Sequence, residues 1–355
     1  MKIVIVTDAA PPQVNGVVIT LTTLGRELGA LGHAVHFVTP ASFRTVPCPT
    51  YPEIRLALFP GAGVRRALDT LRPEAIHIAT EGPLGIAARR YCVRHDLPFT
   101  TSYHTRFPEY VRARAPIPTA LTYAWLRRFH GRAERVMVPT RSIQDELQAR
   151  RFGNTVIWPR GVDIERFCPQ GPRALDQAML ADGHPLFAYV GRVAIEKNLR
   201  AFLDLELPGA KWVIGDGPQL VELRRAYPAV HFTGAVAHAA LPAYYRSADV
   251  FVFPSRTDTF GLVLLEAMAC GVPVAAFPVP GPQDVIGGSA AGVLDADLRV
   301  AAIGALQISR DAARKHALRF SWQHVAKVFL GHLAPIGAVR REKAGLPADG
   351  AEQAL

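Results

Sequence analysis

The sequence predicts an α/β protein built from two doubly wound domains. Short runs rich in β-branched residues alternate with helical patterns, which is typical of parallel strands joined by crossover helices. The alternation begins again after a segment near residue 170 that is rich in Pro, Gly and charge, as linkers are. We therefore expect two Rossmann-like sheets whose strand ends face a shared cleft, where ligands of such sheets bind.

Each half of the chain carries its own set of predicted strands. The first half has KIVIVT, AVHFVT, AIHIAT, FTTSYH and RVMVPT, with helices expected from about 20 to 31 and from 83 to 95. The second half has LFAYVG, KWVIGD, VHFTGAV, VFVFPS and PVAAFP. After residue 311 the stretch AARKHALRFSWQHVAKVFLGHL predicts a helical segment with an apolar face. Its apolar residues are Phe320, Trp322, Val325, Val328 and Phe329.

We expect the domain boundaries to follow these patterns. The first domain is predicted over 1–168 and the second over 169–312. A helix over 313–335 is expected to pack back on the first domain, and 336–355, polar with Pro and Gly, is expected to be a frayed tail.

Composition indicates an ordinary globular protein of a reducing compartment. The chain has 355 residues, 49% of them hydrophobic and 20% charged, which suits two cores. Four cysteines lie far apart, none in a Cys-x-x-Cys pair, so a cytoplasmic location is expected. The first apolar run reaches Asp8 too soon for a signal peptide, and we find no run of about 18 apolar residues that would predict a bilayer-spanning helix.

The net charge of +10 predicts an anionic partner. Residues 106–135 hold seven arginines against two glutamates. This basic patch follows no nucleic-acid-binding motif, so acidic lipid or a phosphorylated small molecule is the expected partner, and nucleic acid is not.

Two loops that follow predicted strands could each bind a phosphate, one through a glycine and the other through basic residues. In PPQVNGV, Gly16 comes just before a helix, where unpaired backbone amides can hold a phosphate; a simple turn is the alternative. In GRVAIEKN, Arg192 and Lys197 follow a strand and suit a diphosphate. The alternative for this pair is solvent exposure beside Glu196.

The segment VIGDGP predicts a tight strand-to-helix turn in which Gly215 and Gly217 allow positive φ and close approach of a ligand. It is not the Gly-x-Gly-x-x-Gly fingerprint, and neither half has one followed by a ribose-binding acid. A dehydrogenase is therefore disfavoured.

Two acids lie in SRTDTFGLVLLEAMACGVPV. We expect Asp258 in the loop after a strand, and Glu266 in a helix that begins near Gly261 and ends at Gly271. An acid among apolar residues is costly unless a polar group meets it. Hydroxyls of a ribose and a hexose would satisfy both acids.

Six motifs in one order carry a family resemblance. They are PPQVNGV, SYHTRFPEY, WPRGVD, GRVAIEKN, GDGP and PSRTDTFGLVLLEAMACGVPV. From Lys2 to about Leu330 the chain resembles the retaining, sugar-nucleotide-dependent glycosyltransferases of family four, which have the GT-B fold. Arg160 in WPRGVD and the motif SYHTRFPEY resemble the branch that acts on lipids, with mannosyl-, glucosyl- and sulfoquinovosyl-transferring members.

The resemblance implies a role for each motif residue. The first domain would bind the acceptor and the second the nucleotide sugar, with Gly16 near the donor diphosphate and Arg192 and Lys197 clamping it. Glu266 would bind the ribose, and His104 would line the donor sugar beside the reacting carbon. Without the resemblance, the alternative for His104 is a hydrogen-bonded structural role, which is common for a histidine after a strand. The remaining donor contacts implied are Gly215, Asp258, Thr259, Phe260 and Gly261.

One motif position departs from the family. Its loop acid is usually glutamate, and Asp258 is one methylene shorter, so the donor sugar cannot be inferred from it. We count His104, Arg192, Lys197 and Asp258 as the catalytic set. No Asp-x-Asp or His/Cys metal motif occurs in the sequence, so we expect no metal or other cofactor, with cations and helix dipoles meeting the diphosphate charge.

A basic, apolar helix is predicted within the patch at 106–135. Leu121, Trp125, Leu126 and Phe129 fall near helical spacing beside arginines, an arrangement that suits an anionic membrane surface. The alternative is a helix packed on the first sheet with solvated arginines. The residues expected to meet the acceptor or membrane are Arg106, Tyr110, Trp125, Arg127 and Arg128.

We therefore expect a retaining, metal-independent hexosyltransferase that moves a sugar from a UDP- or GDP-linked donor to a lipid, above all diacylglycerol, as a peripheral enzyme on the inner face of the cell membrane. One alternative is α-mannosyl transfer from GDP-mannose to phosphatidylinositol or a glycan. Others are a sugar-nucleotide epimerase of the same layout and a non-enzymatic lipid-binding protein.

Overall fold

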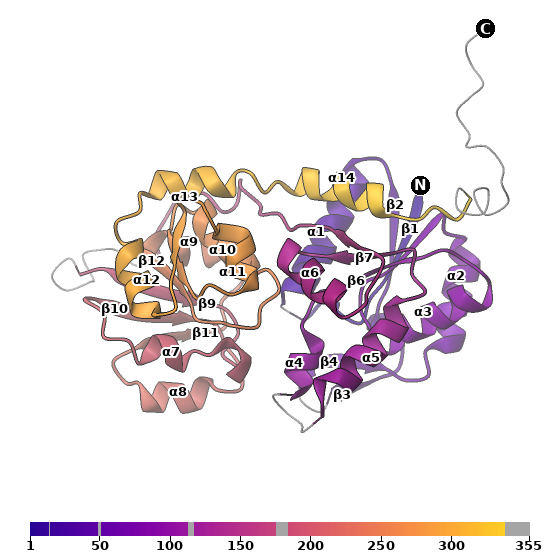
Figure 1. Ribbon diagram of the computed structural model, residues 1–355, viewed down its shortest axis with the longest axis horizontal. Coiled ribbons are helices and arrows are strands. Elements are labelled where there is room, and N and C mark those ends of the chain that lie inside the picture. The colour runs from indigo at the N-terminus through magenta and orange to yellow at the C-terminus, as the bar shows by residue number, and fades with distance from the viewer. Residues whose placement is uncertain (14, 49–50, 113–116, 175–183, 338–355) are drawn as a thin grey trace, which may run out of the picture. The chain divides into compact units, whose positions relative to one another are not determined.

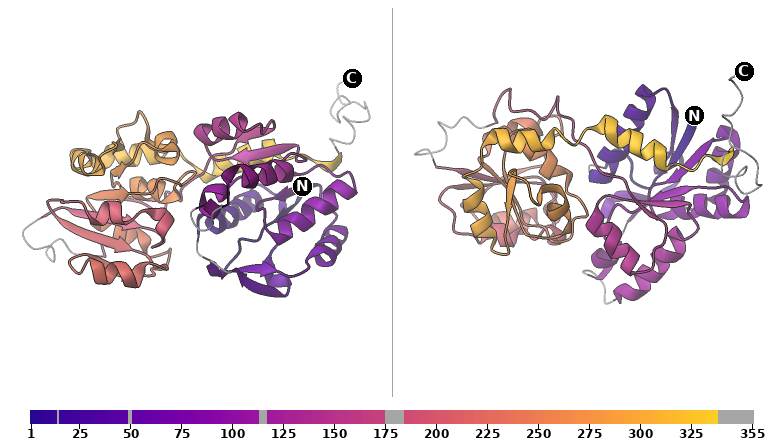
Figure 2. Two further views of the ribbon diagram at one scale, coloured as in Figure 1. Left: turned by 60° about the horizontal axis from the view of Figure 1, so that its bottom comes forward. Right: turned by 45° about the horizontal axis from the view of Figure 1, so that its top comes forward.

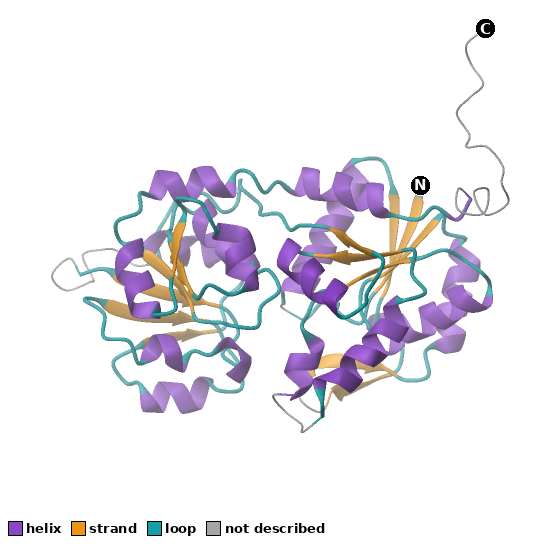
Figure 3. Cartoon of the chain, viewed as in Figure 1, coloured by secondary structure: helices purple, strands orange, loops and turns teal. Residues whose placement is uncertain are grey.

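The computed structural model describes residues 1–13, 15–48, 51–112, 117–174 and 184–337, and it forms two compact units. The first holds Met1–Pro159 together with the chain from Gln323 on, and the second holds Arg160–Trp322. Each unit contains a six-stranded parallel sheet covered by helices (Figures 1 and 3). The predicted doubly wound α/β fold is therefore confirmed for both halves of the chain.

The first sheet has the strand order β2-β1-β5-β6-β7-β8. Its strands are β1 (Lys2–Val6), β2 (Ala34–Val38), β5 (Ala75–Ile78), β6 (Thr100–Ser102), β7 (Arg135–Val138) and β8 (Thr155–Ile157). The helical elements of this unit are α1 (Gly16–Ala30), η1 (Pro40–Ser42), α2 (Gly61–Leu71), α3 (Pro83–Arg94), α4 (Phe107–Arg112), α5 (Thr119–His130), α6 (Arg141–Ala149) and most of α14 (Trp322–His332). An antiparallel pair of strands, β3 (Thr45–Cys48) and β4 (Tyr51–Ala57), was not predicted.

The second sheet has the strand order β11-β10-β9-β12-β13-β14. Its strands are β9 (Leu186–Val190), β10 (Ala210–Ile214), β11 (His231–Gly234), β12 (Val250–Phe253), β13 (Val274–Ala276) and β14 (Gly292–Leu294). The helical elements are η4 (Ile195–Lys197), α7 (Arg200–Leu203), α8 (Leu220–Ala226), α9 (Leu241–Ser247), α10 (Leu262–Ala269), α11 (Pro280–Ile286), α12 (Leu298–Ala305) and α13 (Arg310–Ala317).

Alternation along the central strands of the second sheet builds two cores. In β9, Ala188 packs with α9 and α10 residues, whereas Phe187 and Tyr189 pack with α7 and α12 residues. Successive side chains of a strand point to opposite faces, so a strand covered on both faces is apolar at every position. LFAYV, buried throughout, follows that rule.

The units divide earlier than the boundary that we expected at residue 168. Residues 162–167 already bond to the second unit, since Val162 N donates to Phe320 O at 3.0 Å and Arg314 donates to the carbonyls of Ile164 and Phe167. These bonds tie the predicted linker to the second core.

Burial lowers the pKa of Arg160 to about 9, which still leaves it protonated at neutral pH.

The helical stretch expected after residue 311 is two helices instead of one. Between α13 and α14, Ser321 forms a β-bridge with Val162, which takes these residues out of helical geometry. From Gln323 the chain returns to the first unit, where Trp158 Nε1 donates to Val325 O at 3.2 Å and His332 bonds to Ile157 O at 2.9 Å. Figure 2 shows α14, in yellow, from two further directions. Most of the predicted tail, 338–355, lies outside the described residues.

We expect Trp158→Ala to destabilise the first unit by about 3–5 kcal/mol, because it empties a fully buried site and removes the bond to α14. Urea denaturation followed by circular dichroism measures the change. Trp125→Ala removes a tryptophan that is 39% exposed and serves as the matched control. Equal losses in the two variants would contradict this account of how α14 is anchored.

Candidate functional site

The second sheet places two of the motif loops side by side. β10 and β11 lie on one side of β9, and β12 lies on the other, so the strand order reverses between β9 and β12. Loops at the carboxyl ends of two such strands diverge and leave room for a ligand. The loop after β9 is GRVAIEKN, and the loop after β12 is PSRTDTFG.

Side chains tie these two loops together. Lys197 Nζ donates to Asp258 Oδ1 at 2.6 Å, joining the predicted phosphate cation to the predicted sugar-binding acid. Asn198 Nδ2 donates to Pro254 O at 3.1 Å. The hydroxyls of Ser255 and Thr257 reach Glu196 O at 3.5 and 3.3 Å. The reversal point therefore carries a hydrogen-bonded pair of loops.

The Lys197–Asp258 ion pair is largely shielded from water. Side-chain exposure is 20% for Lys197 and 16% for Asp258, and an ion pair in such surroundings is screened less than one at the surface. Asp258 Oδ2 is buried and has no hydrogen-bond partner in the part of the chain that the structure describes. A buried acceptor of this kind is suited to a ligand hydroxyl.

The glycines near Arg192 bring two loops of the backbone together. Gly215 has a φ of +145°, and a Cβ built on it would lie 1.9 Å from Gly191 O. A Cβ on Gly217 would lie 2.4 Å from Val193 O. Close approach was predicted here for a ligand, but the approaching group in the structure is the backbone of the Arg192 loop. Tyr189 Oη donates to Arg192 O at 2.8 Å and further fixes that loop.

Glu266 lies in the second turn of α10, buried, with both carboxylate oxygens bonded. His238 Nε2 is 3.1 Å from Oε1, and Tyr245 Oη donates to Oε2 at 2.8 Å. Burial and the nearby carboxylate raise the pKa of Tyr245 well above its usual value, so it remains a donor. The predicted polar partner of Glu266 is thus at least partly the protein itself. Sequence reasoning missed His238 and Tyr245, because no periodicity links them to Glu266.

The remaining predicted donor contacts surround the start of α10. Gly261 precedes the helix with a φ of +86°, a left-handed conformation that favours glycine. The Phe260 ring is buried against Phe320, with ring centroids 6.5 Å apart. Thr259 is half-buried between Asp258 and Phe260. The loop from Asp258 to Gly261 is therefore anchored at its end by packing.

In the first unit, Gly16 is the first residue of α1. Asn15 caps the helix, its Oδ1 accepting from Val17 N and Val18 N at 3.1 and 3.0 Å. His104 follows β6 and lies edge-on to Trp158, with ring centroids 5.9 Å apart. The approach of Gly16 and His104 to a donor held by the second unit stays a prediction.

A buried acid that sequence reasoning missed lies at the order reversal of the first sheet. Asp8 follows β1, and its carboxylate accepts from Leu84 N at 3.0 Å, Gly85 N at 3.4 Å and Thr80 Oγ1 at 2.9 Å. Burial raises the pKa of Asp8, and these hydrogen bonds oppose the rise. The carboxylate lies at the start of α3, where the helix dipole favours it, but Asp8 and Leu84 are 76 residues apart, so no local pattern signals the contact.

The predicted acceptor and membrane residues fall into different environments. Arg106 forms an ion pair with Glu146 inside the first unit. Trp125, Arg127 and Arg128 are exposed on α5, and the Tyr110 side chain lies outside the described residues.

The apolar stripe predicted on α5 is divided between two faces. Leu126 and Phe129 are buried in the first unit, which contradicts their place on a membrane-facing stripe. Leu121 and Trp125 are 64% and 39% exposed. The four residues fall near one helical spacing and were therefore predicted to share one face. In the structure only Leu126 and Phe129 pack into the core of the first unit, and the side of α5 that holds Leu121 and Trp125 is exposed.

The described residues contain neither a membrane-spanning helix nor a metal-binding cluster. No helix there has both the length and the apolar composition to cross a bilayer. Within the same ranges, no three His, Cys, Asp or Glu side chains gather as a metal-binding group.

Known proteins similar to this chain share one activity class. The chain is 31% identical to a GDP-mannose-dependent alpha-mannosyltransferase of Mycolicibacterium smegmatis, over 94% of this chain and 96% of the relative. It is 33% identical to a sulfoquinovosyl transferase of Arabidopsis thaliana, over 68% of this chain and 50% of that longer protein. It is 28% identical to an alpha-monoglucosyldiacylglycerol synthase of Streptococcus pneumoniae, over 83% and 75%.

Solved structures give the same fold. The sucrose-phosphate synthase of Thermosynechococcus elongatus matches with a TM-score of 0.73 at 23% identity, over 97% of this chain and 99% of that one. The Anabaena protein HepE, in complex with UDP and glucose, matches with a TM-score of 0.69 at 16% identity, over 93% and 98%. The predicted GT-B fold is therefore confirmed.

Family models describe both halves of the chain. Residues 14–166 match Glycosyltransferase Family 4, and residues 184–308 match Glycosyl transferases group 1. Together with the mannosyltransferase that is similar over nearly its whole length, these matches establish that the chain belongs to the family 4 glycosyltransferases.

Proposed function

We propose that this glycosyltransferase moves a hexose from a UDP- or GDP-linked donor to a lipid hydroxyl, above all that of diacylglycerol, with retention of configuration and without a metal. The observation that carries the donor part is the Lys197–Asp258 pair at the reversal point of the second sheet, with Arg192 on the same loop as Lys197. Shielded cations at such a point suit a diphosphate.

Donor binding would redistribute the charges at this point. The diphosphate replaces Asp258 as the anionic partner of Lys197. Asp258, whose Oδ2 has no hydrogen-bond partner among the described residues, accepts from a hexose hydroxyl. Glu266 accepts from the ribose hydroxyls. Glu266 then bonds both to the protein and to the donor, whereas Asp258 bonds to the donor in place of Lys197.

The proposed chemistry follows from these charges. The bond between the anomeric carbon and the phosphate oxygen breaks, and a bond from that carbon to the acceptor oxygen forms on the same face. The acceptor proton passes to the departing phosphate oxygen. Lys197 and Arg192 stabilise the negative charge that develops on the phosphate, the role that a metal ion fills in other transferases.

Two relatives support a lipid acceptor by their names, a sulfoquinovosyl transferase and an alpha-monoglucosyldiacylglycerol synthase. A second candidate is α-mannosyl transfer from GDP-mannose to phosphatidylinositol or a glycan. The full-length similarity to GDP-mannose-dependent mannosyltransferases favours it, and it uses the same donor site.

A product screen tests the proposal. Purified enzyme is incubated in EDTA with UDP-glucose, UDP-sulfoquinovose or GDP-mannose, and with vesicles that contain diacylglycerol or phosphatidylinositol. We expect a glycosylated diacylglycerol by mass spectrometry, with the donor's anomeric configuration by NMR. A mannosylated phosphatidylinositol would select the second candidate, product that requires added Mg²⁺ would contradict metal independence, and an altered donor sugar without acceptor would indicate an epimerase.

We expect Lys197→Ala to lower kcat/KM by on the order of 10²- to 10³-fold, since a shielded cation at the departing phosphate is lost. Steady-state kinetics with the donor found in the screen measure the change. Lys315→Ala is the matched control, because Lys315 pairs with Asp311 on the exposed surface of the same unit. Unchanged turnover in Lys197→Ala would refute the clamp and favour a lipid-binding protein.

We further propose that α5 meets the inner face of the cell membrane. Leu121 and Trp125 are exposed on this helix beside Arg127 and Arg128, and the exposed Phe107 ring lies 6.1 Å from Trp125. Apolar side chains next to cations insert at an anionic lipid surface, where each cation adds about 1 kcal/mol.

Sedimentation with phosphatidylglycerol vesicles tests this surface. We expect the double variant Leu121→Ser/Trp125→Ser to bind on the order of 10-fold or more weakly, since two exposed apolar side chains no longer enter the lipid. Val221→Ser, at a 77% exposed position of the second unit, is the control. Equal sedimentation of double variant and control would place the membrane contact elsewhere.

A further inference from the structure

We propose that His238 is a positioning residue that holds the Glu266 carboxylate in place for the two vicinal hydroxyls of the donor ribose, and that Arg166 sets the tautomer of His238. The inference rests on the proposed function, because it names how the nucleotide part of that site is organised. His238 lies in the turn between β11 and α9, outside every motif that the sequence singled out.

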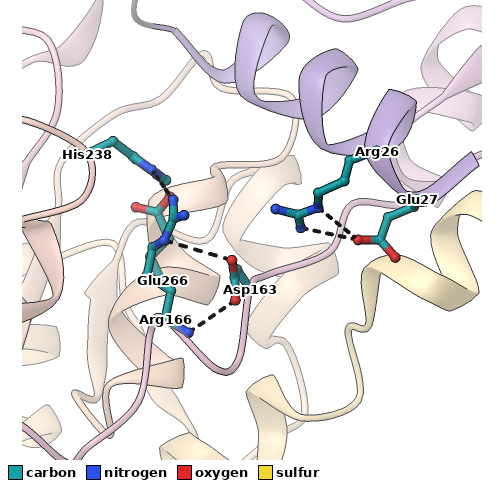
Figure 4. A network of polar contacts seen from close by, with 6 residues as sticks. All are labelled: Arg26, Glu27, Asp163, Arg166, His238 and Glu266. Carbon is teal, nitrogen blue, oxygen red and sulfur yellow. Dashed lines mark hydrogen bonds and ion pairs between the residues drawn. The ribbon is translucent and has the colours of Figure 1, made fainter. Parts of the chain in front are cut away.

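Figure 4 shows the side chains of this network in the second unit: Asp163, Arg166, His238 and Glu266. The His238 ring lies between Glu266 and Arg166. Its Nε2 is 3.1 Å from Glu266 Oε1, and its Nδ1 is 3.4 Å from Arg166 Nη1. The two ring nitrogens therefore face groups of opposite charge.

The chemistry of these partners selects one form of the ring. A guanidinium has only donors, so Nδ1 bonds to Arg166 only by accepting, and it does so without a proton. A neutral imidazole with an unprotonated Nδ1 carries its proton on Nε2. That proton is directed at Glu266, whose carboxylate has only acceptors. Arg166 thus makes His238 a donor to the acid.

Arg166 is held in place by Asp163. The backbone N–H of Arg166 donates to Asp163 Oδ1 at 3.1 Å, and Arg166 Nε lies 3.9 Å from Asp163 Oδ2. The Phe167 ring also packs edge-on against His238, with centroids 5.3 Å apart. The segment that begins the second unit therefore orients a side chain of a distant turn.

The hydrogen bonds leave Glu266 able to accept more. A carboxylate has about four acceptor sites, and among the residues that the structure describes one side-chain donor meets each oxygen, His238 on Oε1 and Tyr245 on Oε2. One site per oxygen remains, a pair matched to two adjacent hydroxyls. Fixing both oxygens before the ligand arrives removes the cost of ordering a mobile side chain on binding.

Nucleoside diphosphates and their 2′-deoxy counterparts test the inference. We measure the Kd of UDP, 2′-deoxy-UDP, GDP and 2′-deoxy-GDP by calorimetry. We expect the wild type to bind the better ribonucleotide about 10-fold or more tightly than its deoxy form, the effect of a hydrogen bond to a charged acceptor. In His238→Asn this preference is expected to fall by about 10-fold.

His238→Gln is the matched variant, because its amide nitrogen occupies the place of Nε2, whereas that of asparagine occupies the place of Nδ1. We expect the glutamine variant to keep most of the preference, a difference that loss of folding alone would not produce. His231→Ala, which removes an exposed histidine packed on Trp212, is the control for the unit.

The outcomes separate the inference from the proposed function. If His238→Asn keeps the full preference for ribose while Glu266→Gln loses it, His238 has no positioning role and the ribose site stands. If asparagine and glutamine at position 238 behave alike, the bond from Nε2 of His238 to Glu266 does not position the acid. If the wild type shows no preference, or Glu266→Gln keeps it, the assignment of Glu266 to the ribose fails, and this inference fails with it.

Discussion

The reversal of strand order between β9 and β12 is the constraint on which the candidate site depends. Two parallel strands whose crossovers run to opposite sides have carboxyl-end loops that diverge and leave a crevice between them. Here side chains bond the two loops to each other at that crevice, through Lys197 and Asp258 and through the carbonyls of Glu196 and Pro254. A lysine and an aspartate that are 61 residues apart thus form one shielded pair.

Buried and partly buried acids in both units follow one rule. Asp8, Glu146 and Glu266 all bond to donors of the protein, the first to backbone amides and a threonine, the second to Arg106 and the third to His238 and Tyr245. A buried carboxylate without donors would be strongly destabilising. Such donors also fix the orientation of each acid. For Glu266 that fixed orientation is what makes the proposed ribose contact possible without further ordering.

From Gln323 the described chain is again part of the first unit. Residues 162–167 are bonded to the second core, and the chain from Gln323 on is bonded to the first through Trp158 and Ile157. The chain therefore passes from one unit to the other twice, at 159–160 and at 322–323. A boundary drawn from composition alone misses this, because Pro, Gly and charge mark a loop but do not say which core the loop packs against.

The sequence by itself determined the features that depend on neighbours along the chain. Apolar runs of strand length identified β1, β9 and β12. Gly261 and Gly271 marked the two ends of the helical pattern that became α10. Motif order identified the family and singled out Lys197, Asp258 and Glu266. Only the tertiary structure decided which groups meet, such as His238 with both Glu266 and Arg166. It also decided that Leu126 is buried while Trp125 is exposed, and that the helical segment is interrupted before Trp322. Those contacts join residues far apart in sequence, and they arise from packing and hydrogen bonding in the folded chain, which leave no local pattern to read.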